Sequence, residues 1–164
     1  MYALFMEMGT GKSKVAIDTM GALFKRKEID TALILAPKGV YDNWVRKEIP
    51  AHLPDDIPTR IVRWQPNFTN KFIQEIKDIA VKENREPGAL HILVMNIEAL
   101  STKKGAASAI KFLQLNPNNI SIVDESTTIK NRKAQRTKTV LEIGRVSKYR
   151  RILTGSPVTK SPLD

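Results

Sequence analysis

A glycine-rich segment that ends in lysine and serine has the composition of a phosphate-binding loop. It reads Met8-Gly9-Thr10-Gly11-Lys12-Ser13 and lies between an apolar run and a helical pattern. Glycines let backbone N–H groups approach phosphate oxygens, and the N-terminus of the following helix adds a positive dipole. Lys12 would contact the β- and γ-phosphates, and the Ser13 hydroxyl would ligate Mg²⁺. The predicted nucleotide site is therefore Gly9, Thr10, Gly11, Lys12 and Ser13.

One position departs from the usual pattern of such a loop. The pattern G-x-x-x-x-G-K-[ST] has its first glycine at the place where this chain has Met6. Taken alone, the segment is therefore also compatible with a chance Gly-Lys-Ser at the start of a helix.

Two adjacent carboxylates provide the second half of a possible phosphoryl-transfer site. Asp124 and Glu125 directly follow the apolar run 120–123. Beside a phosphate loop, Asp124 could hold Mg²⁺ through water, and Glu125 could orient and deprotonate the attacking water. An acidic pair after a strand is also common in solvated turns. Its combination with Lys12 favours the catalytic interpretation, with Lys12, Asp124 and Glu125 as catalytic residues and Ser13 and Asp124 as metal ligands.

The elements that would position these residues alternate along the chain. We expect strands at 3–6, 31–36, 60–63, 90–95, 120–123 and 151–153, and helices at 13–27, 41–49, 67–82 and 134–143. Pro50 is expected to stop the second helix, and Gly144 to cap the last. This alternation predicts an α/β fold with a mostly parallel sheet covered on both faces. The carboxyl ends of parallel strands share one edge, where ligands bind, and the candidate residues follow strands there.

Composition narrows the classes of protein. The 164 residues suit one domain, and the absence of cysteine excludes disulfides and thiolate metal sites. No apolar run approaches the length of about 20 residues that a membrane span needs. A net charge of +10 is compatible with a polyanionic partner and equally with a basic, solvated surface. Much of this charge lies between Lys130 and Arg151, where nine basic residues accompany only one acid, Glu142.

The tryptophans and histidines have less specific signals. Trp44 and Trp64 could stack on nucleic-acid bases, but packing in the core or at its boundary is the favoured interpretation. His52 and His91 lack metal-ligand spacing, and His91, inside an apolar run, is expected to be buried with its hydrogen bonds satisfied.

Four segments, taken in order, resemble the helicase motifs of SNF2-type superfamily 2 ATPases. They are the phosphate loop, Leu35-Ala36-Pro37-Lys38, Asp124-Glu125-Ser126 and Leu153-Thr154-Gly155-Ser156-Pro157. The resemblance covers nearly the whole chain and looks closest to phage and bacterial members. It implies a RecA-like P-loop NTPase fold, ATP and Mg²⁺ as cofactors, double-stranded DNA as a partner and a cytoplasmic location.

The resemblance also implies roles for individual residues. Motif I corresponds to the phosphate loop, and motif II to Asp124 and Glu125. Residues 96–100 lie where motif Ib would be expected. The residues implied in DNA contact, or in coupling it to the nucleotide, are Pro37, Lys38, Lys130, Arg132, Thr154, Gly155, Ser156 and Pro157.

We expect residues 1–164 to form a single RecA-like ATP-binding lobe, because motifs IV to VI and a second RecA-like lobe are not found in them. In this family ATP is hydrolysed between two lobes, and an arginine finger contributes about 10³–10⁵ in rate. The isolated lobe should therefore turn ATP over very slowly. The alternative is a nucleotide- or DNA-binding half-motor that never hydrolyses ATP and acts with a partner lobe. A small-molecule kinase is disfavoured by the segments 129–131 and 154–157.

Overall fold

A parallel six-stranded sheet forms the centre of the molecule, in a computed structural model that describes residues 2–5, 11–124 and 134–154. The spatial order is β1-β6-β5-β2-β4-β3, and every neighbouring pair is parallel. The strands are β1 (Tyr2–Phe5), β2 (Thr31–Ala36), β3 (Thr59–Arg63), β4 (Leu90–Asn96), β5 (Asn119–Val123) and β6 (Tyr149–Thr154). The predicted α/β fold is thus confirmed.

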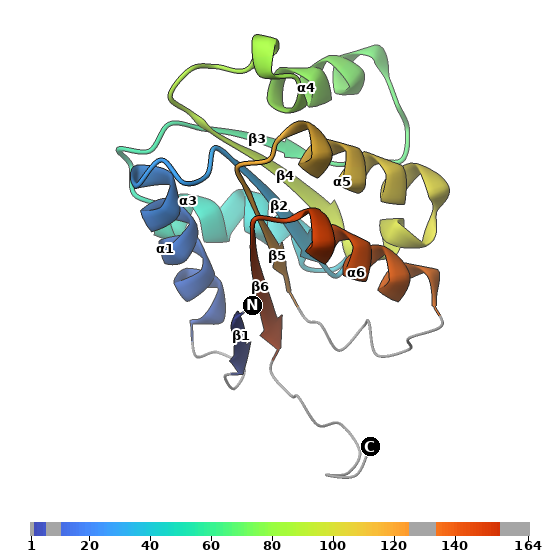
Figure 1. Cartoon of the computed structure of the whole chain (residues 1–164), viewed down its shortest axis with the longest axis horizontal. Helices are drawn as coiled ribbons and strands as arrows, with labels where there is room; N and C mark the ends of the chain where they lie inside the picture. The colour runs from blue at the N-terminus through green and yellow to red at the C-terminus, as the bar shows by residue number, and fades with distance from the viewer. Residues whose placement is uncertain (1, 6–10, 125–133, 155–164) are drawn as a thin grey trace.

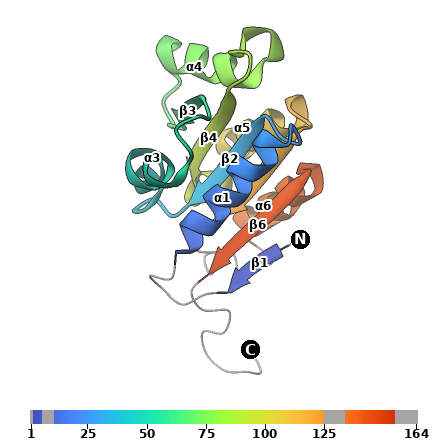
Figure 2. The same cartoon turned by 90° about the vertical axis from the view of Figure 1, so that its left-hand side faces the viewer.

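Helices cover both faces of this sheet (Figures 1 and 2). One face carries α1 (Lys12–Lys25) and a composite helix made of α2 (Tyr41–Asn43), the π-helix η1 (Trp44–Glu48) and α3 (Ile49–His52). The other face carries α4 (Asn70–Ala80), α5 (Lys103–Leu115) and α6 (Gln135–Val146). Two 3₁₀ turns, η2 (Lys82–Asn84) and η3 (Ile97–Ser101), lie on either side of β4 in the sequence.

Alternation along the strands divides the core into two clusters. In β2, Ala32 and Ile34 pack with α1, whereas Leu33 and Leu35 pack with α4 and α5. All six residues of β2 are buried, as expected for a central parallel strand that is covered on both faces. This continuous apolar run is the reason that β2 could be predicted from the sequence.

The composite helix corrects the prediction that Pro50 stops the helix. Helical structure continues through Pro50 to His52. Proline has no N–H to donate to the carbonyl four residues earlier, and here the hydrogen-bond pattern widens just before it. The Ile49 N–H donates to the Trp44 carbonyl, a five-residue step. Pro50 then occupies the first turn of α3, where its missing N–H has little cost.

Other helix boundaries differ from those expected. α4 begins at Asn70 instead of residue 67, because the Thr69 side chain accepts the Phe72 N–H and caps it. α6 continues past Gly144 to Val146, so that glycine is not a C-cap. α5 was not predicted from the sequence. Its N-cap is Thr102, whose side chain accepts the Gly105 N–H at 3.0 Å.

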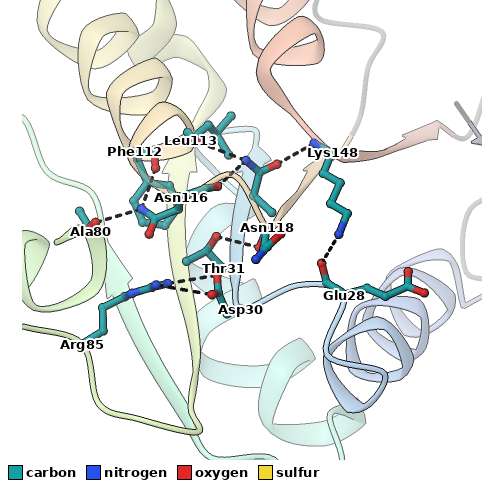
Figure 3. Close-up of polar contacts among 11 residues, drawn as sticks. Glu28, Asp30, Thr31, Ala80, Arg85, Phe112, Leu113, Asn116, Asn118 and Lys148 are labelled. Carbon is teal, nitrogen blue, oxygen red and sulfur yellow. Dashed lines mark hydrogen bonds and ion pairs between the residues drawn. The ribbon is translucent and has the colours of Figure 1, made fainter. Parts of the chain in front are cut away.

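Asparagine side chains join the amino ends of the strands, at the edge opposite the candidate site. The Asn119 amide donates to three carbonyls, and its oxygen accepts the Lys148 N–H at 2.9 Å. The Asn116 amide donates to the Ala80 and Phe112 carbonyls, and the Lys148 ammonium reaches the Glu28 carbonyl (Figure 3). These bonds satisfy backbone groups where the connections between strands and helices would otherwise leave them unpaired.

The surroundings of His91 also differ from what the sequence predicted. It is 2% exposed, as predicted, but neither ring nitrogen has a hydrogen-bond partner among the described residues. Burial first, and then the neighbouring Arg85 guanidinium, lower the pKa of His91 below its usual value. The imidazole is therefore held neutral in the folded protein.

This burial predicts a loss of stability in mild acid. With its pKa lowered in the folded state, His91 takes up its proton more readily in the unfolded chain. Stability should therefore fall as the pH drops through the unfolded pKa near 6.5. The slope from this group is at most about 1.4 kcal/mol per pH unit. Urea unfolding at pH 7.5 and pH 5 should show His91→Gln losing less stability than the wild type. Equal pH dependence in the His91→Gln variant would contradict this account.

Candidate nucleotide site

The carboxyl ends of the strands bring several predicted site residues to one edge of the sheet. Pro37 and Lys38 follow β2, Asn96 ends β4, Asp124 follows β5 and Thr154 ends β6. The register shows how closely the ends align: Ala36 pairs with Asn96, and Phe5 of β1 pairs with Thr154. The topology therefore gathers residues that are as many as 117 positions apart in the sequence, from Pro37 to Thr154.

The N-terminus of α1 has the features of an anion site. Gly11 is its N-cap, with φ of 80° and ψ of 27°, a left-handed conformation that favours glycine. Its N-cap residue provides no side-chain cap, and its first turn has no acidic residue. Among the described residues, no side-chain acceptor is thus recorded for the first N–H groups of the helix, which together with its dipole favour an anion at this end.

Lys12 gives the strongest indication that this helix end binds a ligand. The residue is only 9% exposed, and its ammonium has no hydrogen-bond partner among the described residues. A buried ammonium without a partner is costly unless an anion compensates it. Phosphate oxygens are such anions, so the residues present fit a nucleotide phosphate. Ser13, the next residue, is half-buried.

Asp124 is held at the edge of the sheet by two hydrogen bonds. Its backbone N–H donates to the Leu35 carbonyl at 2.7 Å, which extends the β2–β5 pairing by one residue. Its Oδ2 accepts the Trp44 Nε1–H at 2.9 Å. Asp124 is 7% exposed, so the carboxylate is buried and oriented. An acidic oxygen ligand held in this way suits a hard cation such as Mg²⁺.

The segment after β2 is connected to the end of β4. The Pro37 carbonyl accepts both the Val40 and Tyr41 N–H groups, which closes a turn, and the exposed Lys38 donates its backbone N–H to Glu98 Oε2 at 3.0 Å. Glu98 belongs to η3, which begins where the Asn96 side chain accepts the Ala99 N–H at 2.8 Å. The segment that contains Pro37 and Lys38 is thus in direct contact with residues 96–100, where motif Ib is expected.

Eight predicted site residues lie outside the described residues, and their roles stay predictions. They are Gly9, Thr10, Glu125, Lys130, Arg132, Gly155, Ser156 and Pro157. Thr154, which directly precedes three of them, is buried at the end of β6.

The described basic residues between 134 and 151 do not all lie at this edge. α6 runs away from it, and β6 returns, so that Lys148 precedes the amino end of β6 and contacts the carbonyl of Glu28. In the described part of this stretch, Lys138 and Arg145 are exposed on α6. Only the first part of the stretch therefore lies close in sequence to Asp124, and the end that includes Lys148 is at the opposite edge.

A cavity lies outside the candidate site. It has a volume of about 430 Å³, lies between α4 and α5 in the helical layer, and is lined mainly by apolar side chains, among them Phe72, Ile76 and Phe112. Within residues 2–5, 11–124 and 134–154, no cluster of three metal-ligating side chains occurs, and no helix is long and apolar enough to span a membrane.

Two contacts at this edge were not predicted from the sequence. The first is the hydrogen bond from Trp44 to Asp124. Trp44 and Trp64 are 0% and 3% exposed, which confirms that both pack in the core, but the packing interpretation did not include this bond. The contact of Glu98 with Lys38 was also not anticipated. Both contacts join residues at least 60 positions apart, and no local pattern indicates such pairs.

Comparison with known proteins identifies a family. The family model described as the SNF2-related domain matches residues 3–164. Two curated relatives from Arabidopsis thaliana are similar over 94% of this chain: probable ATP-dependent DNA helicases CHR12, at 28% identity, and CHR23, at 27%. The chain spans only 13% of the length of either relative.

A solved structure shares the fold. The Sulfolobus solfataricus SWI2/SNF2 ATPase core in complex with dsDNA superposes with a TM-score of 0.63 at 22% identity, over 94% of this chain and 27% of the other. This likeness confirms the predicted RecA-like α/β fold.

Proposed function

The chain belongs to the SNF2-related domain family, and on that premise we propose that residues 1–164 are the ATP-binding lobe of a DNA-dependent ATPase. The observation that carries the proposal is the buried ammonium of Lys12 at the N-terminus of α1, which has no hydrogen-bond partner in the part of the chain that the structure describes. Asp124, a buried and oriented carboxylate, lies at the same edge of the sheet. A cation for phosphate and an acid for a metal ion are the two groups that phosphoryl transfer needs from such a fold.

In this proposal the site residues divide the work of binding and hydrolysing ATP. Gly9, Thr10 and Gly11 bring backbone N–H groups to the phosphates, and Lys12 neutralises phosphate charge. Ser13 and Asp124 hold Mg²⁺, which, when bound, would neutralise charge that develops on the phosphate oxygens. Glu125 orients the attacking water and accepts its proton. The protein thus contributes positioning and electrostatic stabilisation, which are the main sources of catalysis in phosphoryl transfer.

Double-stranded DNA is the proposed partner. The net charge of +10 supports this, because neutralising phosphates releases counterions. The related SWI2/SNF2 core was solved with dsDNA. We assign DNA contact to Pro37, Lys38, Lys130 and Arg132, and coupling to the nucleotide to the segment from Thr154 to Pro157. Contacts of this kind to the phosphate backbone do not depend on base sequence, as a translocating motor requires.

A second RecA-like lobe would complete the hydrolysis site. The described residues form one sheet with its covering helices, and the chain spans only 13% of the relatives. We propose that the second lobe, and an arginine finger with it, lie outside residues 1–164, either in the same polypeptide or in trans. On this basis the lobe alone binds ATP but hydrolyses it slowly.

The experiment that tests the function is ATP hydrolysis by residues 1–164, with and without duplex DNA. Lys12→Ala and Glu125→Gln serve as inactive controls. We expect nucleotide binding that requires Lys12, together with turnover near background. DNA-stimulated turnover that both variants lose would mean that a second copy of the chain can replace the second lobe. Nucleotide binding that is the same in the wild type and in Lys12→Ala would reject the proposed function and favour a module that binds only DNA or a partner lobe.

A further inference from the structure

The contact between Trp44 and Asp124 connects two segments that the sequence separates by 80 residues. The Trp44 Nε1–H donates to Asp124 Oδ2 at 2.9 Å. Trp44 is 0% exposed and Asp124 is 7% exposed, so water has little access to this bond. A hydrogen bond to a charged group contributes about 1.5–3 kcal/mol, and its partner is costly to leave unsatisfied when buried.

The Trp44 side chain is fully buried in the core. Trp44 belongs to the core cluster that includes Ala16, Ile17 and Met20 of α1, the helix that begins at Lys12. It is also the first residue of the π-helix η1, whose wide turn precedes Pro50. π-Helical turns are rare and often occur at functional sites. The residue that bonds Asp124 therefore belongs to the same core cluster as the helix that begins with the phosphate-binding lysine.

A second tryptophan shows that burial by itself does not create such a bond. Trp64 is 3% exposed, but its Nε1–H has no hydrogen-bond partner among the described residues. Trp64 lies on the other side of the sheet, in the cluster with Phe72 and Leu93. The two indoles are thus alike in size and burial and differ in the group that the N–H contacts.

We propose that Trp44 is a positioning residue for the metal site: its indole N–H holds Oδ2 of Asp124 and thereby directs Oδ1 toward the Mg²⁺ that accompanies ATP. This inference rests on the proposed function. An indole N–H can only donate, so it pairs with a carboxylate without competing as a metal ligand. Groups that orient a ligating carboxylate in this way typically contribute about 10-fold to 100-fold to metal affinity or activity.

The proposal gives Trp44 an effect that a purely structural residue would not have. A packing role would change the stability of the protein and would affect nucleotide binding equally with and without metal. A positioning role changes the benefit that Mg²⁺ gives to nucleotide binding. The ratio of the nucleotide dissociation constant in chelator to that in Mg²⁺ therefore distinguishes a positioning role from a packing role.

The first test uses Trp44→Phe, which keeps an aromatic ring in the core and removes the donor. Trp64→Phe is the matched control, because it removes a buried indole that lacks a hydrogen bond. Calorimetric titration of residues 1–164 with a non-hydrolysable ATP analogue, in Mg²⁺ and in excess chelator, gives the ratio for each protein. We expect the ratio to fall by about 10-fold to 100-fold in Trp44→Phe, with chelator binding unchanged, and to stay at the wild-type value in Trp64→Phe.

A second measurement does not depend on how well Trp44→Phe folds. In the Trp64→Phe protein, Trp44 is the sole tryptophan, so its emission reports on the hydrogen bond. We expect Mg²⁺ with the ATP analogue to change this emission more than the analogue in chelator does, and we expect Asp124→Ala to abolish that difference.

Each outcome decides the question. A wild-type ratio in Trp44→Phe overturns the positioning role, as does an emission from Trp44 that ignores Mg²⁺, while nucleotide binding that still requires Lys12 leaves the proposed function intact. If the wild type binds the nucleotide no better in Mg²⁺ than in chelator, this inference fails. If, in addition, Lys12→Ala binds as the wild type does, the proposed function fails with it.

Discussion

Replacing Lys12 with alanine is expected to weaken ATP binding by about 10-fold to 150-fold, which corresponds to a charged hydrogen bond of roughly 1.5–3 kcal/mol. The same substitution should not destabilise the ligand-free protein. The Lys12 ammonium is buried and has no partner among the described residues, so its removal relieves a desolvation cost. Loss of binding together with unchanged or higher resistance to urea would identify a group retained for its ligand.

Lys14 provides the matched control for this prediction. It lies two residues further along α1, its side chain is 57% exposed, and it pairs with Asp18 at 2.7 Å. Exposed pairs of this type contribute little, so Lys14→Ala should change ATP affinity and stability only slightly. Isothermal titration with ATP and urea unfolding measure the two quantities. Equal effects of the two alanine variants on affinity would show that Lys12 has no special role.

Replacing Gly105 with alanine is expected to destabilise the fold by about 1–3 kcal/mol, because the added methyl group has no space. A Cβ on Gly105 would lie 2.1 Å from the Ala99 carbonyl oxygen and 3.0 Å from Thr102 Oγ1. The Ala99 carbonyl already accepts the Thr102 N–H and hydroxyl, so it is poorly placed to move. The clash therefore falls on the backbone that joins η3 to α5.

Gly144 offers the opposite case. It is also a helical glycine, but a Cβ there would meet only the Arg150 side chain, at 3.6 Å or more. Alanine is favoured over glycine in a helix interior by up to about 1 kcal/mol, so Gly144→Ala should stabilise α6. Urea unfolding should thus give changes of opposite sign for the two variants. A Gly105→Ala protein as stable as the wild type would contradict the packing described for the η3–α5 junction.

Local patterns in the sequence determined the class of fold and most of the elements. β2 is a continuous apolar run because both of its faces are covered, and α1 follows Gly11 because this N-cap position has a left-handed φ of 80°, which favours glycine. Elements whose signals are mixed were less predictable. α5 begins with Lys103, Lys104 and Gly105, of which the glycine disfavours a helix, and its start depends on a threonine cap and on contact with η3.

The helix that contains Pro50 shows why a local rule can fail. Proline usually ends a helix, and this preference underlies the prediction that the helix stops at Pro50. The structure widens one turn into a π-helix ahead of the proline, and burial of Trp44 and Ile49 in the core stabilises the continued helix. Packing energy from residues distant in sequence thus outweighed the local preference.

For the site, the sequence by itself determined which residue types were available: a glycine-lysine-serine helix start, an acid after a buried strand, and a motif order typical of the SNF2-related domain family. The tertiary structure decided which of the described groups meet. It left the Lys12 ammonium without a partner within residues 2–5, 11–124 and 134–154, gave Asp124 an indole donor from position 44, and placed Lys148 at the opposite edge of the sheet. These outcomes depend on strand order and on side-chain burial, which arise from contacts between distant segments, and no periodicity or spacing along a single chain encodes them directly.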